Sequence, residues 1–243
     1  MDDPARLLNH SARRINRLAE MAGAHRYLEV GVQAGATFHA VKIPRRVGVD
    51  PKFAFDTAQY AGADTQFHAM TSDAYFSQLS FDERFDIVFI DGLHTFEQAL
   101  RDFHNAVVHG HADSIWIIDD TVPIDAYSAH RNQKEAVAVR RRERRQESAA
   151  WHGDVYKLVF ALHDFFPAFD YCTICTGGNP QTLAWLEKNP RKPLFNDLER
   201  ICRLDYFEFT RHMEILNPVS EAEGLARMER FFHSRGSALD LRR

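Results

Sequence analysis

The sequence predicts a doubly wound α/β fold, because short apolar segments alternate with helical segments over the first half of the chain. The fourth and fifth apolar segments are almost continuously apolar, as parallel strands buried on both faces are. The predicted strands are Tyr27–Val30, Arg46–Val49, Thr65–His68, Phe85–Ile90 and Ser114–Ile118. Helices are expected between them at Thr37–Val41, Phe53–Ala61, Ser72–Leu79 and Thr95–Val108, the last with its apolar residues on one face.

The second half of the chain predicts two more strands and further helices. Phe169–Cys175 and Gln181–Leu186 flank a turn, which predicts an antiparallel pair and a mostly parallel seven-stranded sheet. Residues 4–22, 131–150, 154–164 and 196–234 are expected to be helical, the last broken at Asn217-Pro218. The domains expected are an N-terminal helix in 1–24, an α/β domain in 25–188 with an insertion or lid at 121–152, and a helical extension in 189–243.

Composition narrows the class of protein. The chain has 243 residues, with 45% hydrophobic and 26% charged, which fits a globular protein. Thirty basic and 34 acidic residues give a net charge of −4, so neither nucleic acid nor an anionic membrane is an expected partner. The three cysteines predict no disulfide framework, and no apolar segment predicts a leader or membrane span. The expected compartment is the cytoplasm.

Carboxylates follow four of the five predicted parallel strands. In such a sheet ligands bind beyond the carboxyl ends of the strands, so these groups should line one site. Each one taken alone is equally well explained as a helix cap. The strand-end segments are Glu29 to Gly35, Asp50, Thr71-Ser72-Asp73, Asp91 to His94, and Asp119-Asp120.

The loop after the first strand carries the most information. Gly31 and Gly35 allow a tight turn and a close ligand, but Gln33 stands where a pyrophosphate-binding loop has its second glycine. A nicotinamide-dependent dehydrogenase is therefore the weakest alternative. Glu29 lies inside a buried strand and needs a cationic or strongly donating partner. Asp50 is placed to accept hydrogen bonds from ribose hydroxyls.

The pattern Glu29-x-Gly31-x-x-x-Gly35 followed by Gly48-Val49-Asp50 resembles the cofactor-binding start of class I S-adenosylmethionine-dependent methyltransferases. The resemblance implies a Rossmann-like sheet that ends in a reversed strand. It further implies that the glycine turn passes the methionine part of S-adenosylmethionine (SAM) and that Asp50 holds the ribose. Ser72 and Asp73 would lie near the adenine. With Asp91 at the same edge, the cofactor-binding set implied is Glu29, Gly31, Gly35, Asp50, Ser72, Asp73 and Asp91.

A narrower resemblance lies in the segment from Phe89 to Asp102 and in Ile117-Ile118-Asp119-Asp120. It is similar to the branch that contains macrocin O-methyltransferase and the rhamnosyl O-methyltransferase/cephalosporin hydroxylase-like proteins. This implies methylation of a hydroxyl on a sugar or other natural product. It also implies Mg²⁺ held by Asp91, Asp119 and Asp120, and catalysis by Asp91 together with His94 as general base. One of the two adjacent aspartates could instead only orient the site, and His94 could only cap its helix.

The chemistry is consistent with these residues. SAM is already a strong methyl donor, so the protein must align the acceptor oxygen and help to remove its proton. Two alternatives stay open: a metal-independent methyltransferase with His94 as base, and a non-catalytic cofactor-binding protein that acts through its C-terminal helices. The second predicts an apolar patch in residues 196–234. Phe207, Phe209, Phe231 and Phe232 could form an oligomer interface there.

Three further segments have simpler interpretations. Cys172 and Cys175 lie in a predicted strand without a second pair, so core packing is favoured over zinc. The basic run Arg140–Arg145 is interpreted as a solvated helix face, with binding of an anionic substrate as the alternative. Trp151 and Tyr156 are weak candidates for the substrate pocket, and a helix start capped by Asp154 is the favoured interpretation.

Overall fold

The computed structural model describes residues 9–145, 148 and 150–240. Residues 4–8 of the predicted N-terminal helix, 146, 147 and 149 of the insertion, and 241–243 of the extension lie outside the described residues. The strands are β1 (Arg26–Val30), β2 (Arg45–Val49), β3 (Thr65–His68), β4 (Ile87–Ile90), β5 (Ile115–Ile118), β6 (Asp170–Ile174), β7 (Gln181–Trp185) and β8 (Pro218–Val219). The α-helices are α2 (His10–Ala22), α3 (Ala36–Ala40), α4 (Ser72–Gln78), α5 (Phe96–Val108), α6 (Gln133–Arg144), α7 (Tyr156–Phe165), α8 (Leu198–Arg203), α9 (Tyr206–Phe209) and α10 (Glu221–Asp240).

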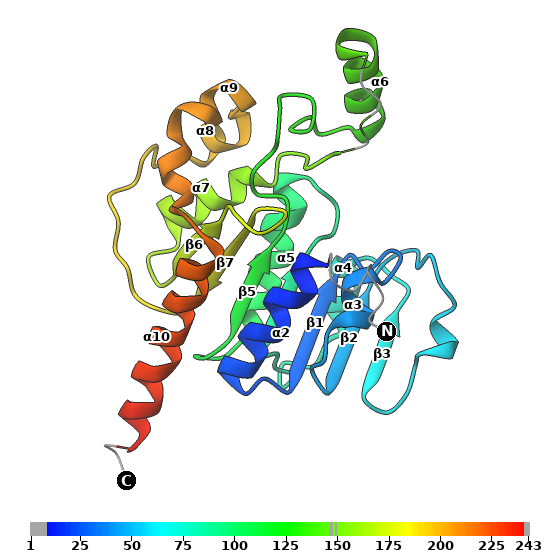
Figure 1. The fold of residues 1–243 in the computed structure, drawn as a ribbon, viewed down its shortest axis with the longest axis vertical. Helices are drawn as coiled ribbons and strands as arrows, with labels where there is room; N and C mark the ends of the chain where they lie inside the picture. Colours follow the sequence, from blue (N-terminus) through cyan, green and yellow to red (C-terminus); the bar gives the residue numbers. More distant parts are fainter. Residues whose placement is uncertain (1–8, 146–147, 149, 241–243) are drawn as a thin grey trace.

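The strands form one mixed sheet in the order β3-β2-β1-β4-β5-β7-β6-β8 (Figure 1). Every pairing is parallel except those of β7, which runs antiparallel to both β5 and β6. The predicted mostly parallel Rossmann-like sheet with a reversed strand is therefore confirmed. One strand was not predicted: β8, a two-residue strand at the break in the helical extension, brings the strands of the described residues to eight.

Helices cover both faces of the sheet, which explains the continuous apolar runs. In β4, Val88 and Ile90 pack into the core shared with α4, α5 and α7. Ile87 and Phe89 point the other way, into the core shared with α2, α3 and α10. Because successive side chains of a strand point to opposite faces, a strand covered on both sides must be apolar at every position. Figure 1 shows α10 beside β6 and β7, at the end of the sheet opposite β3.

The helix predicted at Phe53–Ala61 is wrong. This segment is a loop with one short 3₁₀-helix, η1 (Thr57–Gln59). The backbone bends at Ala54 and Phe55, and the rings of Phe53 and Phe55 both pack edge-on against Phe67 of β3 at 5.4 Å between centroids. This packing outweighs the weak helical preference of the segment.

The C-terminal segment packs on the sheet through α8, α9, the 3₁₀-helix η2 (Thr210–Leu216) and α10. Of the phenylalanines predicted as an interface, Phe209 and Phe231 are buried in the protein's own core, whereas Phe207 is 66% exposed. The helix that contains the basic run, α6, extends away from the rest of the molecule (Figure 1). Within the described residues, no helix is both long enough and apolar enough to span a bilayer.

Candidate active site

A crevice of about 710 Å³ lies at the carboxyl ends of the parallel strands. The chain runs from β1 outward to β2 and β3, then returns to place β4 on the other side of β1. At such a switch point the loops after neighbouring strands turn to opposite faces of the sheet and leave an opening between them. The crevice walls come from the loops after β1 to β5 and from two residues of the predicted insertion, Gln133 and Trp151.

Gly31 forms the wall between β1 and β4. Its φ is +90°, and a Cβ atom built there would lie 1.9 Å from the carbonyl oxygen of Asp91. No side chain fits in that space, so the wall is bare backbone. Gly35, at φ +74°, starts α3 and packs against the His39 ring instead of lining the crevice.

Asp50 and Ser72 both line the crevice, as predicted. The two carboxylate oxygens of Asp50 accept backbone N–H groups, from Gln33 at 2.8 Å and from Lys52 at 2.7 Å. These bonds fix the carboxylate at the mouth of the loop after β1. Asp73 does not line the crevice, because its carboxylate turns outward to the Arg101 guanidinium at 3.2 Å.

Glu29 has the strong donor that the sequence predicted it would need. The Tyr27 hydroxyl, two residues earlier on the same strand face, donates to Glu29 Oε2 at 2.6 Å. Burial, with the nearby Asp91 and Asp119 carboxylates, raises the pKa of Glu29 well above its usual value despite that hydrogen bond. Glu29 lies beneath the crevice and is not part of its lining.

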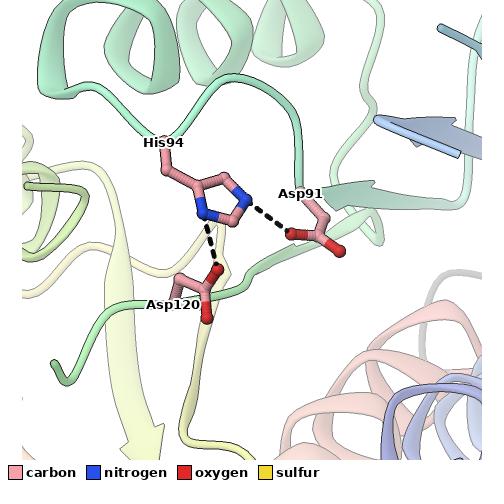
Figure 2. A group of neighbouring side chains, drawn as sticks. All are labelled: Asp91, His94 and Asp120. Atoms are coloured by element: carbon pink, nitrogen blue, oxygen red, sulfur yellow. Dashed lines mark ion pairs between the residues drawn. The ribbon is translucent and has the colours of Figure 1, made fainter. Parts of the chain in front are cut away.

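His94 bridges two aspartates from neighbouring strands (Figure 2). Its Nε2 lies 3.2 Å from Asp91 Oδ1, and its Nδ1 lies 3.0 Å from Asp120 Oδ2 and 3.2 Å from the Trp151 carbonyl oxygen. The Trp151 indole stacks on the imidazole with 4.7 Å between the ring centroids. The imidazole is therefore fixed at its two nitrogens by Asp91, Asp120 and the Trp151 carbonyl, and on one face by the Trp151 indole.

The two carboxylates decide the charge of His94. Burial alone would lower the pKa of the imidazole, but hydrogen bonds and charge attraction from Asp120 and Asp91 outweigh it and raise the pKa to about 10. Burial raises the pKa of Asp91 to about 6, opposed by the hydrogen bond from His94. In this arrangement His94 is an imidazolium at neutral pH, so it cannot accept a proton while both carboxylates hold it.

Asp91, His94 and Asp120 have ligand atoms within 4.8 Å of one another, which suits one divalent cation. The predicted metal set, Asp91, Asp119 and Asp120, differs from this group at one member. Asp119 also lines the crevice, but its Oδ1 accepts the Asn179 amide at 2.6 Å and the backbone N–H of Asp120 at 2.9 Å. Asp120 has a left-handed backbone, φ +58°, at the point where the chain leaves β5.

One contact near the site was not predicted from the sequence. Asn179 lies in the turn expected between Cys175 and Gln181, and its side chain contacts both strand-end aspartates of β5.

Three other segments have roles in packing. Arg140 of the basic run is buried, and it pairs with Asp125 at 2.8 Å, so it fixes the insertion and does not face solvent. Tyr156 is a core residue whose hydroxyl donates to the Leu204 carbonyl, and the two-cysteine strand is core at Cys172.

Known proteins share the fold of this chain. Residues 11–121 match the family model described as a methyltransferase domain. No protein of the curated set matches the chain. Among solved structures, the cofactor-bound Rv0187 from MTB is 21% identical over 77% of this chain and 92% of that chain, with a TM-score of 0.52. The O-methyltransferase from Bacillus cereus in complex with SAH (S-adenosylhomocysteine) is 16% identical over 77% and 92%, also with a TM-score of 0.52.

At these identities the solved structures show a shared fold. The family match covers all five parallel strands, the glycine turn after β1 and the acidic ends of β2, β4 and β5. The matched segment thus contains the parallel half of the sheet that the methyltransferase-domain model describes. The chain is accordingly a SAM-dependent methyltransferase, of the enzyme class EC 2.1.1.

Replacing Gly31 with alanine is expected to raise the Kd for SAH at least tenfold, because the new methyl group would push the loop away from Asp91 and close the wall. Calorimetric titration measures this. Gly62→Ala is the matched control, since a Cβ atom at Gly62 meets nothing within 4 Å. Equal SAH affinity in the two variants would contradict the assigned wall.

The His94 cluster predicts a pH-dependent stability. The folded pKa of about 10 lies above the unfolded value of about 6.5, so the stabilisation is complete below pH 6.5 and is lost as the pH rises through 10. In chelator-containing buffer, the Tm difference between wild type and His94→Gln should therefore shrink between pH 7 and pH 10.5. A difference that stays constant over this range would show that His94 is not held as a cation.

Proposed function

We propose that this enzyme transfers a methyl group from SAM to a hydroxyl of a small molecule, a sugar or another natural product, with the help of a divalent cation. The observation that carries the proposal is the grouping of Asp91, His94 and Asp120 on the wall of the same crevice that Asp50 and Ser72 line. The pattern from Phe89 to Asp102, which resembles sugar and natural-product O-methyltransferases, supports the choice of acceptor. We propose the cytoplasm as its compartment.

The crevice volume suits a nucleoside-sized cofactor together with an acceptor. In this proposal the bare backbone at Gly31 receives the methionine part of SAM, Asp50 accepts hydrogen bonds from the ribose hydroxyls, and Ser72 lies at the adenine end. Gly35 begins α3, behind the loop that follows β1. Glu29 in β1 and Asp91 after β4 support the wall that Gly31 forms. The Bacillus cereus and Podospora anserina structures, described as SAH complexes, share this fold and support the assignment.

SAM, when bound, supplies an electrophilic methyl carbon, so the protein must place an oxygen nucleophile in line and remove its proton. A divalent cation held by Asp91, Asp120 and the neutral imidazole of His94, with Asp119 behind them, would release the His94 proton on binding and lower the pKa of an acceptor hydroxyl. Mg²⁺ and Mn²⁺ both suit the carboxylates, and the imidazole favours Mn²⁺. Asp91, whose pKa lies at about 6 without a cation, is ionised at neutral pH, so it can hold the cation or, in the metal-independent alternative, take up the proton.

The acceptor end of the crevice is formed by Leu93, Gln133 and Trp151. Leu93 is 60% exposed, so its side chain is free to contact an acceptor. An apolar side chain, an indole and an amide together suit the mixed polarity of a sugar or of a hydroxylated ring. Because Gln133 and Trp151 both come from the insertion, movement of the insertion would open and close this end.

Asp50→Ala is expected to raise the Kd for SAM and SAH at least tenfold, because a charged acceptor of ribose hydrogen bonds is lost. Asp73→Ala is the matched comparison, since Asp73 follows the next strand but pairs with Arg101 outside the crevice. Calorimetric titration of both variants separates the two roles. A loss of affinity in Asp73→Ala as large as in Asp50→Ala would restore the adenine contact that the sequence predicted for Asp73.

Removal of divalent cations is expected to reduce methyl transfer roughly a hundredfold, because the acceptor hydroxyl would keep its ordinary pKa. The measurement uses radiolabelled SAM and a panel of glycosides and phenols, with and without EDTA. Activity should return with Mg²⁺ or Mn²⁺. Transfer that is unaffected by EDTA would favour the metal-independent mechanism, and SAH binding without transfer to any acceptor would favour the non-catalytic alternative.

A further inference from the structure

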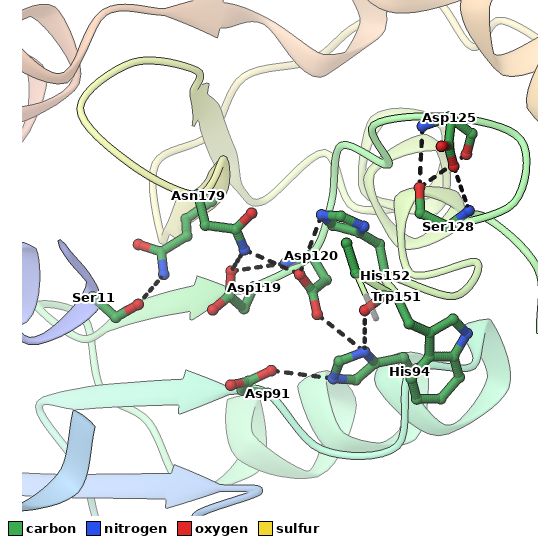
Figure 3. Close-up of polar contacts among 12 residues, drawn as sticks. Ser11, Asp91, His94, Asp119, Asp120, Asp125, Ser128, Trp151, His152 and Asn179 are labelled. Atoms are coloured by element: carbon green, nitrogen blue, oxygen red, sulfur yellow. Dashed lines mark hydrogen bonds and ion pairs between the residues drawn. The ribbon is translucent and has the colours of Figure 1, made fainter. Parts of the chain in front are cut away.

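The loop between β6 and β7 reaches across to the strand-end aspartates of β5. Asn179 in this loop directs its side-chain amide at both of them (Figure 3). Its Nδ2 donates to Asp119 Oδ1 at 2.6 Å and to Asp120 Oδ1 at 3.0 Å. A single NH₂ group therefore joins two adjacent, buried carboxylates that belong to a different part of the chain.

This contact matters because the two carboxylates repel each other. Two donors from one amide let Asp119 and Asp120 lie side by side at fixed orientation. Asp120 uses its Oδ1 for Asn179 and is left with Oδ2 facing His94, at 3.0 Å from Nδ1. The amide and His152 Nε2, which lies 3.7 Å from the same Oδ1, thus face one oxygen of Asp120 and leave the other in the cluster with Asp91.

The loop itself is held by a buried guanidinium from α2. Arg14, which is 1% exposed, donates to the backbone carbonyls of Asn179 at 2.6 Å and Thr176 at 2.7 Å. It also donates to the Gln181 side chain at 2.9 Å and pairs with Glu221 of α10 at 2.8 Å. A charged side chain this deeply buried and fully paired is a rigid support, since breaking any one contact leaves a buried polar group unsatisfied.

We propose that Asn179 is a positioning residue: it holds Asp120 in the orientation in which Asp120, Asp91 and His94 bind a divalent cation, and thereby sets the affinity for that cation. This rests on the cation site of the proposed function. Asn179 is not itself a member of the candidate ligand group, so it acts through Asp119 and Asp120. Arg14 fixes the loop that contains Asn179 to α2.

The test is a Mn²⁺ titration followed by electron paramagnetic resonance of the free ion, on the full-length protein. Asn179→Ala should weaken Mn²⁺ binding at least tenfold and leave the Kd for SAH within threefold of wild type. The matched control is Asn189→Ala, which removes another amide–carboxylate hydrogen bond, to Asp170 at 2.8 Å. That bond involves none of the crevice residues, so Mn²⁺ affinity should be unchanged.

Thermal unfolding of each variant separates positioning from general destabilisation. Asn179→Ser keeps one donor and serves if the alanine variant does not fold; its Mn²⁺ affinity should fall between the wild-type value and that of a variant without a donor. Unchanged Mn²⁺ affinity in the Asn179 variants, or an equal loss in Asn189→Ala, would overturn the proposal. Wild type that binds SAH but not Mn²⁺ would also overturn it and leave the methyltransferase assignment intact. Wild type that binds Mn²⁺ but not SAH would count against the proposed function, and the Asn179 variants would still decide this inference.

Discussion

Strands β1 and β4 are neighbours in the sheet, although the chain completes β2 and β3 between them. The backbone of Gly31 passes so close to the Asp91 carbonyl that a Cβ atom has no room. This close approach fixes the position of the carboxyl end of β1 relative to that of β4. The polar residues that follow the other parallel strands lie on either side of this junction. Asp50 lies on one side of the junction, and Asp91 and Asp120 lie on the other.

The site places several carboxylates in a region that the core would otherwise fill with apolar groups. Burial raises the pKa of Glu29, Asp91 and Asp119, which means that the folded protein resists their ionisation. His94 offsets part of this cost by carrying positive charge between Asp91 and Asp120. Such an arrangement weakens the fold in comparison with an apolar core of the same shape, and that is characteristic of active sites.

Most of the sheet could be predicted, because strands covered on both faces must be apolar throughout. The segment Phe53–Ala61 could not, since its aromatic residues pack against β3 in a way that only the folded sheet creates. Crevice residues at strand ends were predictable because parallel strands end at a common edge. The outward turn of Asp73 and the separation of Asp119 from the His94 cluster depend on local backbone direction. Asn179 comes from a turn more than fifty residues away in sequence, and only the strand pairing brings it there.

The contacts of the buried Arg14 join residues that the ribosome synthesises far apart in time. Strands β1 to β5, with the crevice between them, are made in the first half of the chain, whereas Glu221 follows Arg14 by 207 residues. The strand ends that line the crevice are therefore synthesised before the loop and the helix that support Asp120. The aspartates of β5 acquire their amide partner only after the β6–β7 hairpin emerges, and the guanidinium gains its counter-ion last. A chain that stopped before α10 would contain every residue that lines the crevice, but Arg14 would lack the Glu221 carboxylate with which it pairs.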